Sequence, residues 1–442
     1  MRIGFGKRDI TPRLGVELYG YSGYLNRYAT AVRDRLWARS MAVSDGKQTA
    51  VVVSCDLIFI TRELAAEVRR RVGQTTGLHD ACIMVHATHT HSGPCLRLPY
   101  HNAYDPPYME MLPRRIAGSC IDAVRSMQEG EILHATVPCE GMGTNRVYDK
   151  FNYGQEALDD GFRPAKPERT DTSCHVLKVL TGGRMSGFIS YFGCHNVVGG
   201  PGCTYIHGDY AGIATGLLER EEPGSVGLFL QGAEGDVNAA ACCFGNAQVV
   251  GALDIMAGRY ARAVRHGLAV AKPIEADGVR VTRRRTRFTH RPVPLSDLRE
   301  RLAEEDIVIE NPEVDDTDET FRWAVLRSQA LRSIIERVEH GASFEEETEV
   351  QGIRIGPVAL LGAPFEIFQA IKNETVDKAQ APVPLVLSVT NDEQGYAVDR
   401  TAAQDETDYA ARTVPLWKHT MPYDDIHGEL VSALLALDAD LA

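Results

Sequence analysis

The sequence predicts a mixed fold of the α/β or α+β class. Short runs rich in β-branched residues alternate with helical patterns from the first residue to about residue 280. Hydrophobic residues occupy 44% of the 442 positions and charged residues 24%, a balance typical of a globular protein with a large core. The chain has no repeat of fixed period, which excludes solenoids and propellers.

The predicted strands and helices follow one another closely in the first half of the chain. Apolar, β-branched runs predict strands over residues 49–60, 81–85, 173–180, 185–192 and 225–231. Apolar residues at helical spacing predict helices over residues 62–72 and 109–127. Gly182 and Gly183 separate two of these strands and predict a tight hairpin turn.

Residues 292–348 differ in composition from the rest of the chain. They are dense in Glu, Asp and Arg, and apolar side chains recur at helical spacing over residues 321–338. We interpret this segment as a charged helical excursion on the surface, whose charges serve solvation. Strands are predicted to resume over residues 349–361 and 383–389.

Charge and cysteine content narrow the class of protein. The net charge of −13 argues against nucleic acid as a partner, because phosphate binding needs a basic face. The N-terminus lacks the apolar stretch of a secretion signal, and no segment approaches the roughly 18 apolar residues of a membrane span. The ten cysteines include no Cys-x-x-Cys pair, so we expect free thiols in a cytoplasmic protein.

Three histidines cluster where a predicted strand ends. His86, His89 and His91 follow the apolar run of residues 81–85 and precede a Gly-Pro turn signal. Strand side chains alternate between faces, so His89 and His91 are expected to project to the same side. Such a pair could begin a transition-metal site, or place one ligand beside a proton-transfer group. The alternative is that the histidines merely cap or solvate a loop.

Three further polar side chains occupy the same kind of position. His195 follows the predicted strand at residues 185–192, Glu366 follows an apolar strand, and Tyr396 follows a Gly-containing loop. Each has a structural alternative when taken singly: a buried loop histidine, a glutamate at a helix N-terminus, a packed aromatic ring. Together with the first cluster they repeat one pattern, in which a strand is followed by a turn and a polar ligand, and function concentrates on such loops.

An ordered series of motifs resembles the neutral/alkaline ceramidase family. It comprises Asp9-Ile10-Thr11-Pro12, His89-Thr90-His91-Ser92-Gly93-Pro94, Asn145-Arg146, Gly193-Cys194-His195, Gly208-Asp209-Tyr210-Ala211-Gly212, Gly235-Asp236-Val237, Pro364-Phe365-Glu366 and Gly395-Tyr396-Ala397. The resemblance extends over nearly the whole chain, to about Tyr409. It implies a zinc-dependent amide hydrolase built as a layered α-β-β-α sandwich of mixed sheets with flanking helices, here a single catalytic domain over residues 1–442.

The same resemblance implies a role for each site residue. It assigns one zinc ion to the ligands His89, His195, Glu366 and Tyr396. Imidazole and carboxylate are ordinary zinc donors, whereas a tyrosine ligand rests on the resemblance alone. His91 is then the acid/base group, and Arg146 and Tyr409 stabilise the oxyanion that develops when metal-activated water attacks a carbonyl. His86 returns to a structural role.

The sequence also departs from the family pattern. Asn238 stands where the family has a serine, which excludes a serine nucleophile but leaves a metal-water mechanism intact. Cys95 and Leu96 replace a Gly-Gly pair, and an aromatic loop through Tyr100, His101, Tyr104 and Tyr108 could reshape the mouth of the pocket. Nothing after Ala442 corresponds to the family's immunoglobulin-like domain. These departures favour a small soluble substrate in the cytoplasm over ceramide; the oligomeric state is left open.

Other functions share some of these residues. A metal-dependent hydrolase acting on a lactone, an ester or a sugar-derived, glycosidic substrate would use the same set. An amidohydrolase also begins with a His-x-His strand motif, but that fold needs an eight-stranded barrel, which the Gly182–Gly183 hairpin fits poorly. A metal-binding module without catalysis is the remaining alternative, favoured only by the missing serine.

Overall fold

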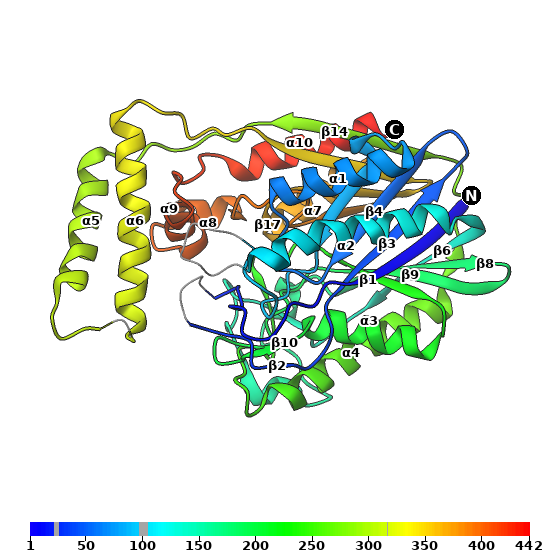
Figure 1. The fold of residues 1–442 in the computed structure, drawn as a ribbon, viewed down its shortest axis with the longest axis horizontal. Coiled ribbons are helices and arrows are strands. Elements are labelled where there is room, and N and C mark those ends of the chain that lie inside the picture. Colours follow the sequence, from blue (N-terminus) through cyan, green and yellow to red (C-terminus); the bar gives the residue numbers. More distant parts are fainter. Residues whose placement is uncertain (22–25, 97–104, 316) are drawn as a thin grey trace.

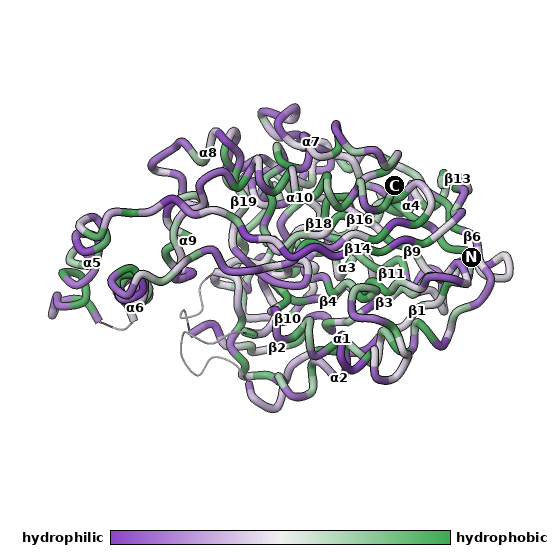
Figure 2. Tube along the Cα trace, turned by 90° about the horizontal axis from the view of Figure 1, so that it is seen from above, coloured by the Kyte–Doolittle hydropathy of each residue, from purple (hydrophilic) through white to green (hydrophobic). Residues whose placement is uncertain are grey.

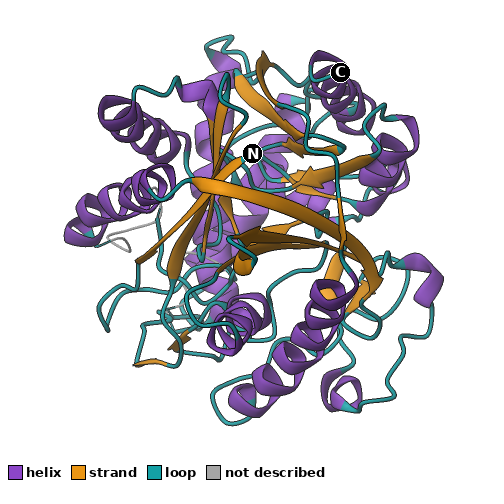
Figure 3. Ribbon diagram, turned by 90° about the vertical axis from the view of Figure 1, so that its right-hand side faces the viewer, coloured by secondary structure: helices purple, strands orange, loops and turns teal. Residues whose placement is uncertain are grey.

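Two β-sheets packed face to face form the centre of the molecule. The computed structural model describes residues 1–21, 26–96, 105–315 and 317–442. The larger, nine-stranded sheet has the order β11-β9-β8-β6-β1-β3-β4-β5, with β13 paired to β6, and the smaller has the order β14-β15-β16-β18. Both sheets contain parallel and antiparallel neighbours. Figures 1 and 3 show the helices lying outside the two sheets.

The strands of the larger sheet are β1 (Arg2–Asp9), β3 (Trp37–Ser44), β4 (Thr49–Cys55), β5 (Ile83–Ala87), β6 (Gln128–Pro138), β8 (Ser173–Thr181), β9 (Arg184–Phe192), β11 (Val226–Gln231) and β13 (Lys272–Pro273). Those of the smaller sheet are β14 (Val279–Thr286), β15 (Thr348–Ile355), β16 (Val358–Gly362) and β18 (Val383–Leu387). Short strands pair β2 (Ala31–Val32) with β10 (Tyr205–Ile206), β7 (Gly143–Asn145) with β12 (Val237–Ala239), and β17 (Glu366–Ile367) with β19 (Tyr396–Ala397).

Helices cover the outer face of each sheet. The larger sheet is covered by α1 (Arg62–Thr76), α2 (Pro106–Arg125), α3 (Asp209–Glu221) and α4 (Val249–Val270). The smaller sheet is covered by α7 (Gln369–Lys378) and α10 (Ile426–Asp440). The remaining helices are α5 (Leu295–Glu310), α6 (Glu319–Glu339), α8 (Arg400–Gln404) and α9 (Val414–Trp417). The layers therefore follow the order helix, sheet, sheet, helix, and the predicted α-β-β-α sandwich of mixed sheets is confirmed.

The alternation of side chains along each strand divides the core between the layers. In β4, Val51 and Val53 pack with the helices α1 and α2, whereas Val52 packs between the sheets. Leu360 of β16 belongs to the same core between the sheets. Because both faces are buried, these strands consist of almost continuous apolar residues, which is why they could be recognised in the sequence.

Several elements differ at their ends from the predictions. The strand predicted over residues 49–60 ends at Cys55, and the strand predicted over residues 81–85 starts at Ile83 after a short 3₁₀ turn and ends at Ala87.

Gly182 and Gly183 adopt φ values of 57° and 77°, the left-handed conformation that a tight hairpin requires, so the predicted turn is confirmed. The barrel considered for an amidohydrolase does not occur, since the sheets of the described chain are open.

The charged segment at residues 292–348 forms the helical pair α5 and α6. Figure 1 shows this pair projecting from one end of the molecule, and Figure 2 shows strongly hydrophilic stretches on it. Arg327 pairs with Glu305, and Arg332 with Asp306, between the two helices. α6 also packs on α9, so the pair is attached to the body. Across the described residues, no helix has the length and apolarity needed to cross a membrane.

Candidate metal centre

Loops that follow strands of both sheets meet at one end of the sandwich. His89 follows β5, and His195 follows β9 of the same sheet. β17 and β19 run parallel with Glu366 directly opposite Tyr396, so a single pairing brings these two residues together. Asn391 ties the sheets to each other, because its backbone N–H donates to Val85 and its side chain accepts from the same residue. The four predicted ligands therefore lie in one place.

The imidazoles of His89 and His195 converge on the carboxylate of Glu366. Oε2 of Glu366 lies 3.0 Å from Nε2 of His195 and 3.4 Å from Nε2 of His89. His91 lies next to this group, with its Nε2 atom 3.2 Å from Nε2 of His89. All three histidines are buried. His89, His91 and His195 thus form a cluster whose nitrogen atoms could hold a metal ion.

Backbone carbonyls fix the orientation of two of the rings. Nδ1 of His89 donates to the carbonyl of Ile58 at 2.6 Å, and Nδ1 of His195 donates to the carbonyl of Glu234 at 2.7 Å. This arrangement leaves Nε2 of each ring facing Glu366 and is the usual support of a metal-binding histidine. Nδ1 of His91 has no hydrogen-bond partner in the described structure.

The imidazoles of His89 and His91 do lie close together, but the expectation that they share the face of a strand is wrong. The strand ends at Ala87, and His89 adopts φ of 64°, in the left-handed region that non-glycine residues rarely occupy. The two imidazoles meet because the chain turns there. Strain of this kind persists only where surrounding contacts hold it, and it concentrates at functional sites.

The charges of the cluster reinforce one another. Burial lowers the pKa of His89, but the neighbouring carboxylate of Glu366 outweighs burial and raises that pKa to about 9. Burial raises the pKa of Glu366, yet His89 and His195 together hold it well below its ordinary value. Burial lowers the pKa of His195 to about 4. The carboxylate is therefore ionised and stabilises a positive charge beside it.

Arg146 and Tyr396 lie against each other next to this cluster. Nη2 of Arg146 donates to the carbonyl of Gly235 at 2.6 Å, and its guanidinium carbon lies 5.3 Å from the centre of the Tyr396 ring. Burial raises the pKa of Tyr396 well above its usual value, and the charge of Arg146 opposes that rise. The predicted oxyanion arginine and the predicted tyrosine ligand are thus neighbours.

Tyr409 lies at the solvent-exposed edge of this cluster. It begins a short π-helix at Tyr409–Thr413, is 49% exposed, and packs edge-on against Trp417 at 5.1 Å. Burial raises the pKa of its hydroxyl, while the charge of Arg146 lowers it, which places the two groups within electrostatic reach. The structure therefore brings Tyr409 near the site with its hydroxyl buried and about half of the residue exposed.

Residues 1–249 of the chain match the family described as neutral/alkaline non-lysosomal ceramidase, N-terminal. The chain belongs to this family. The matched part contains His89, His91, His195 and Arg146, whereas Glu366 lies beyond it. The resemblance seen in the sequence is confirmed, and family membership supports a hydrolase.

Two solved structures share the fold. A neutral ceramidase from Pseudomonas aeruginosa superposes with a TM-score of 0.73 at 18% identity, covering 99% of this chain and 74% of its own. A ceramidase complexed with C2 gives a TM-score of 0.72 at 17% identity, covering 100% of this chain and 75% of its own. No curated protein sequence matches the chain significantly. At these identities the likeness concerns the fold.

Asn238 is the residue that the sequence analysis placed where the family pattern has a serine. Its side-chain oxygen accepts a hydrogen bond from Nη1 of Arg146 at 3.4 Å, and its amide nitrogen donates to the carbonyl of Phe151 at 3.2 Å. The residue is buried. Asn238 therefore helps to hold the arginine, and an amide at this position offers no nucleophilic hydroxyl.

His86 has the structural role expected of it. Its Nε2 atom accepts the backbone N–H of Gln231 at 2.8 Å, and its Nδ1 atom lies 3.0 Å from the hydroxyl of Thr390. Burial lowers its pKa to about 3, so the ring is neutral. Both ring nitrogens are used, and neither faces the cluster.

The aromatic loop lies mostly outside the described residues. Tyr100, His101 and Tyr104 fall among the positions that the structure does not describe. Tyr108 is described and is buried in α2, where its hydroxyl donates to the carbonyl of Ile10 at 2.7 Å. The expectation that Tyr108 shapes the pocket mouth is therefore wrong, because the ring is part of the core under α2.

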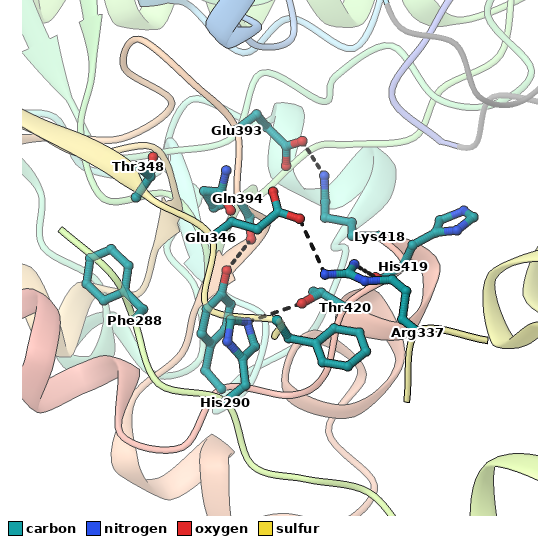
Figure 4. Close-up of a pocket in the computed structure, with 12 residues that line it drawn as sticks. Phe288, His290, Arg337, Glu346, Thr348, Glu393, Gln394, Lys418, His419 and Thr420 are labelled. Atoms are coloured by element: carbon teal, nitrogen blue, oxygen red, sulfur yellow. Dashed lines mark hydrogen bonds and ion pairs between the residues drawn. The ribbon is translucent and has the colours of Figure 1, made fainter. Parts of the chain in front are cut away.

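A polar pocket borders the loop that carries Tyr396. Figure 4 shows Glu393 facing Lys418 and Glu346 facing Arg337 in this pocket. Glu393 also accepts the backbone N–H of Gly395 at 3.0 Å. The ion pair with Lys418 thus helps to fix the turn immediately before Tyr396, and we interpret the pocket as support for that turn.

Glu234 is a site residue that the sequence analysis missed. Its carboxylate lies close to the imidazole of His89 and the carboxylate of Glu366. One potential ligand atom from each of the three residues lies within 4.8 Å of the other two. The signal was available, because Glu234 follows the apolar strand β11 in a Gly-rich turn, as the predicted ligands follow theirs. The sequence analysis singled out Asp236 instead, two positions further on, because Asp236 belongs to the family motif.

Proposed function

We propose that this protein is a zinc-dependent hydrolase that cleaves an amide bond in a small soluble substrate. The observation that carries the proposal is the convergence of His89 and His195 on Glu366, with each ring held through Nδ1 by a backbone carbonyl. Burying such polar groups costs free energy unless they are hydrogen-bonded, paired with an opposite charge or bound to a metal ion. Membership of the ceramidase family supports the hydrolytic chemistry.

The donor set suits a zinc ion. His89, His195 and Glu366 supply two imidazole nitrogens and a carboxylate oxygen, and Tyr396 lies beside Glu366 as the proposed fourth ligand. Supported Nδ1 atoms fix the tautomer in which Nε2 can bind a cation. A bound zinc ion supplies a coordinated water whose pKa falls toward about 7, and it polarises a carbonyl oxygen.

We assign proton transfer to His91. Its ring is buried and neutral because burial lowers its pKa well below the ordinary value. Unlike the two proposed ligand rings, its Nδ1 atom accepts or donates no hydrogen bond among the residues that the structure describes. The ring can therefore accept a proton at Nε2, which faces the cluster, and pass it to a leaving amine.

Arg146 and Tyr409 are proposed to bind the substrate carbonyl. Hydrogen bonds to Gly235 and Asn238 hold the guanidinium in place before substrate arrives, as effective charge stabilisation requires. Tyr409 at the rim can donate its hydroxyl once substrate covers it. Since Asn238 replaces the serine, the chain offers no covalent nucleophile at that position.

The substrate and compartment are part of the same proposal. All ten cysteines are free, and all but Cys243 are buried, as suits a reducing compartment such as the cytoplasm. We expect an N-acyl amide that is smaller and more soluble than ceramide. Esters and lactones present the same carbonyl to the same residues, so they belong in the substrate screen.

Metal analysis combined with a substrate screen tests the proposal. Purified wild-type protein should contain one zinc ion per chain and hydrolyse at least one member of a panel of N-acyl amides, lactones and acyl sugars. His89→Ala should lose both properties, whereas His175→Ala should keep them, because His175 stacks on His134 in the sheet away from the cluster. Wild-type protein without a stoichiometric metal would refute the metal centre, and metal without hydrolysis would indicate a binding module.

A further inference from the structure

Glu234 carries a buried carboxylate that lacks a hydrogen bond. The side chain is 0% exposed, and neither carboxylate oxygen has a partner in the described structure. The hydroxyl of Ser388 lies near the carboxylate but forms no hydrogen bond of normal geometry with either oxygen. An ionised carboxylate buried in this way is strongly disfavoured unless a cation compensates it.

The turn that carries Glu234 is held tightly at the metal centre. The main-chain carbonyl of Glu234 accepts the hydrogen bond from Nδ1 of His195. The next residue, Gly235, donates its N–H to the carbonyl of Ile367 at 2.8 Å. A Cβ atom on Gly235 would lie 2.6 Å from the carbonyl oxygen of Glu366, so only glycine allows this close approach. The side chain of Glu234 is thus directed at the cluster by the same turn that orients His195.

The geometry indicates one ion and not two. The two groups of ligand atoms, His89 with His91 and His195, and His89 with Glu234 and Glu366, have His89 in common. His89 can offer only Nε2, because its Nδ1 atom is bound to the carbonyl of Ile58. A single ring nitrogen binds a single ion, so both groups describe the surroundings of the same position.

We propose, on the basis of the metal centre above, that Glu234 is an additional carboxylate ligand of this ion. The centre then holds two carboxylates, from Glu234 and Glu366, besides its imidazoles. A second carboxylate adds negative charge and a further oxygen donor, which raises the coordination number above four. Oxygen-rich donor sets of this kind accommodate Mn²⁺ better than purely nitrogen and sulfur sites do.

Metal affinity of an isosteric variant tests the role of Glu234 directly. Glu234→Gln keeps the volume of the side chain but removes its charge. Competition with a chelator should show an affinity for Zn²⁺ and Mn²⁺ reduced by more than about 100-fold, beyond the range typical of residues that only support a ligand. Glu17→Gln is the matched control, because Glu17 is also buried with an unpartnered oxygen but belongs to neither group of ligand atoms. That control should bind metal as the wild type does.

Two further measurements separate ligation from simple damage to the fold. The cobalt-substituted wild-type protein should show the weak visible absorption of a centre with more than four ligands, and Glu234→Gln should show the stronger absorption of a four-coordinate ion. In the presence of a chelator, Glu234→Gln should melt at a temperature equal to or higher than the wild type, because the two side chains have the same volume and the described structure gives the carboxyl group of Glu234 no hydrogen bond that the variant could lose.

The outcomes distinguish this inference from the proposed function. If His89→Ala loses the ion while Glu234→Gln retains the wild-type affinity and cobalt spectrum, the role of Glu234 is refuted and the metal centre stands. If Glu234→Gln loses affinity but also melts lower than the wild type in chelator, the loss comes from the fold and the inference is refuted. If the wild type binds no divalent ion, both proposals fail.

Discussion

Truncating His91 to alanine should separate turnover from metal binding. The ring lies beside the proposed ligand His89, with 3.2 Å between their Nε2 atoms. The backbone around it is held independently of the ring, because its N–H donates to the carbonyl of Asn196 at 3.3 Å and its carbonyl accepts from Arg27 at 2.7 Å. Removing the side chain therefore leaves His89 in position, and His91→Ala should retain its metal.

The expected loss is that of a general acid/base group. Such groups contribute about 10²- to 10⁴-fold to the rate, so kcat should fall by that factor, equivalent to about 3 to 5 kcal/mol in the activation barrier. Because burial lowers the pKa of His91, the acid limb of the wild-type profile of kcat/KM should lie below pH 6.5. That limb should disappear in His91→Ala.

The assay compares turnover of the best amide, metal content and thermal unfolding in wild type, His91→Ala and His175→Ala. Added imidazole should restore part of the lost turnover, because it can enter the space that the ring vacates. If metal content falls in parallel with turnover, His91 is a ligand and the division of roles is wrong. If His91→Ala turns over at the wild-type rate, the ring has no part in proton transfer.

Three other variants test the surroundings of the site. Gly20→Ala should lower kcat at least about tenfold with the metal retained, because its Cβ atom would lie 2.7 Å from the ring of His91; unchanged kcat would contradict that contact. Arg39→Leu should lower the free energy of unfolding by about 3 to 5 kcal/mol in a denaturant titration. The guanidinium of Arg39 lies 2.8 Å from the carboxylate of Asp56, and the variant leaves that carboxylate buried without this cation. A loss under about 1 kcal/mol would contradict this reasoning. Burial lowers the pKa of His86 to about 3, so the folded protein binds this proton only at a lower pH than the unfolded protein does. The free energy of unfolding therefore decreases as the pH falls below about 6.5. Between pH 6 and pH 4 the wild type should therefore lose about 2 kcal/mol more than His86→Gln; equal slopes would show that the ring titrates normally.

The sequence predicted the positions of most strands and helices well. Strands such as β9 and β11 are buried on both faces over most of their length, so their apolar residues form runs that stand out from the neighbouring turns. The ends of the elements were predicted less well. The strand predicted over residues 49–60 ends at Cys55, because local propensity does not determine where a neighbouring strand stops pairing. The role of Tyr108 was misjudged because the burial of its ring depends on packing beneath α2.

The proposed site could be foreseen only in part. His195 and Glu366 were recognisable because polar residues directly after apolar strands are exceptions that call for an explanation. The strand argument for His89 was incorrect, since its left-handed backbone depends on tertiary contacts. Glu234 follows the apolar strand β11 as the predicted ligands follow theirs, but the sequence does not show that its side chain is fully buried.

The sequence by itself determined the class of fold, the order of the elements and the kinds of donor atom available after each strand. Periodicity and turn chemistry act over a few residues, so these features can be recognised locally. Only the tertiary structure decided which donors meet: Nε2 of His195 lies 3.0 Å from Glu366, although 171 positions separate them in the chain. Burial and carbonyl contacts likewise arise from segments far apart in sequence. They orient the imidazoles and, within the described part of the chain, leave Glu234 without a hydrogen-bond partner.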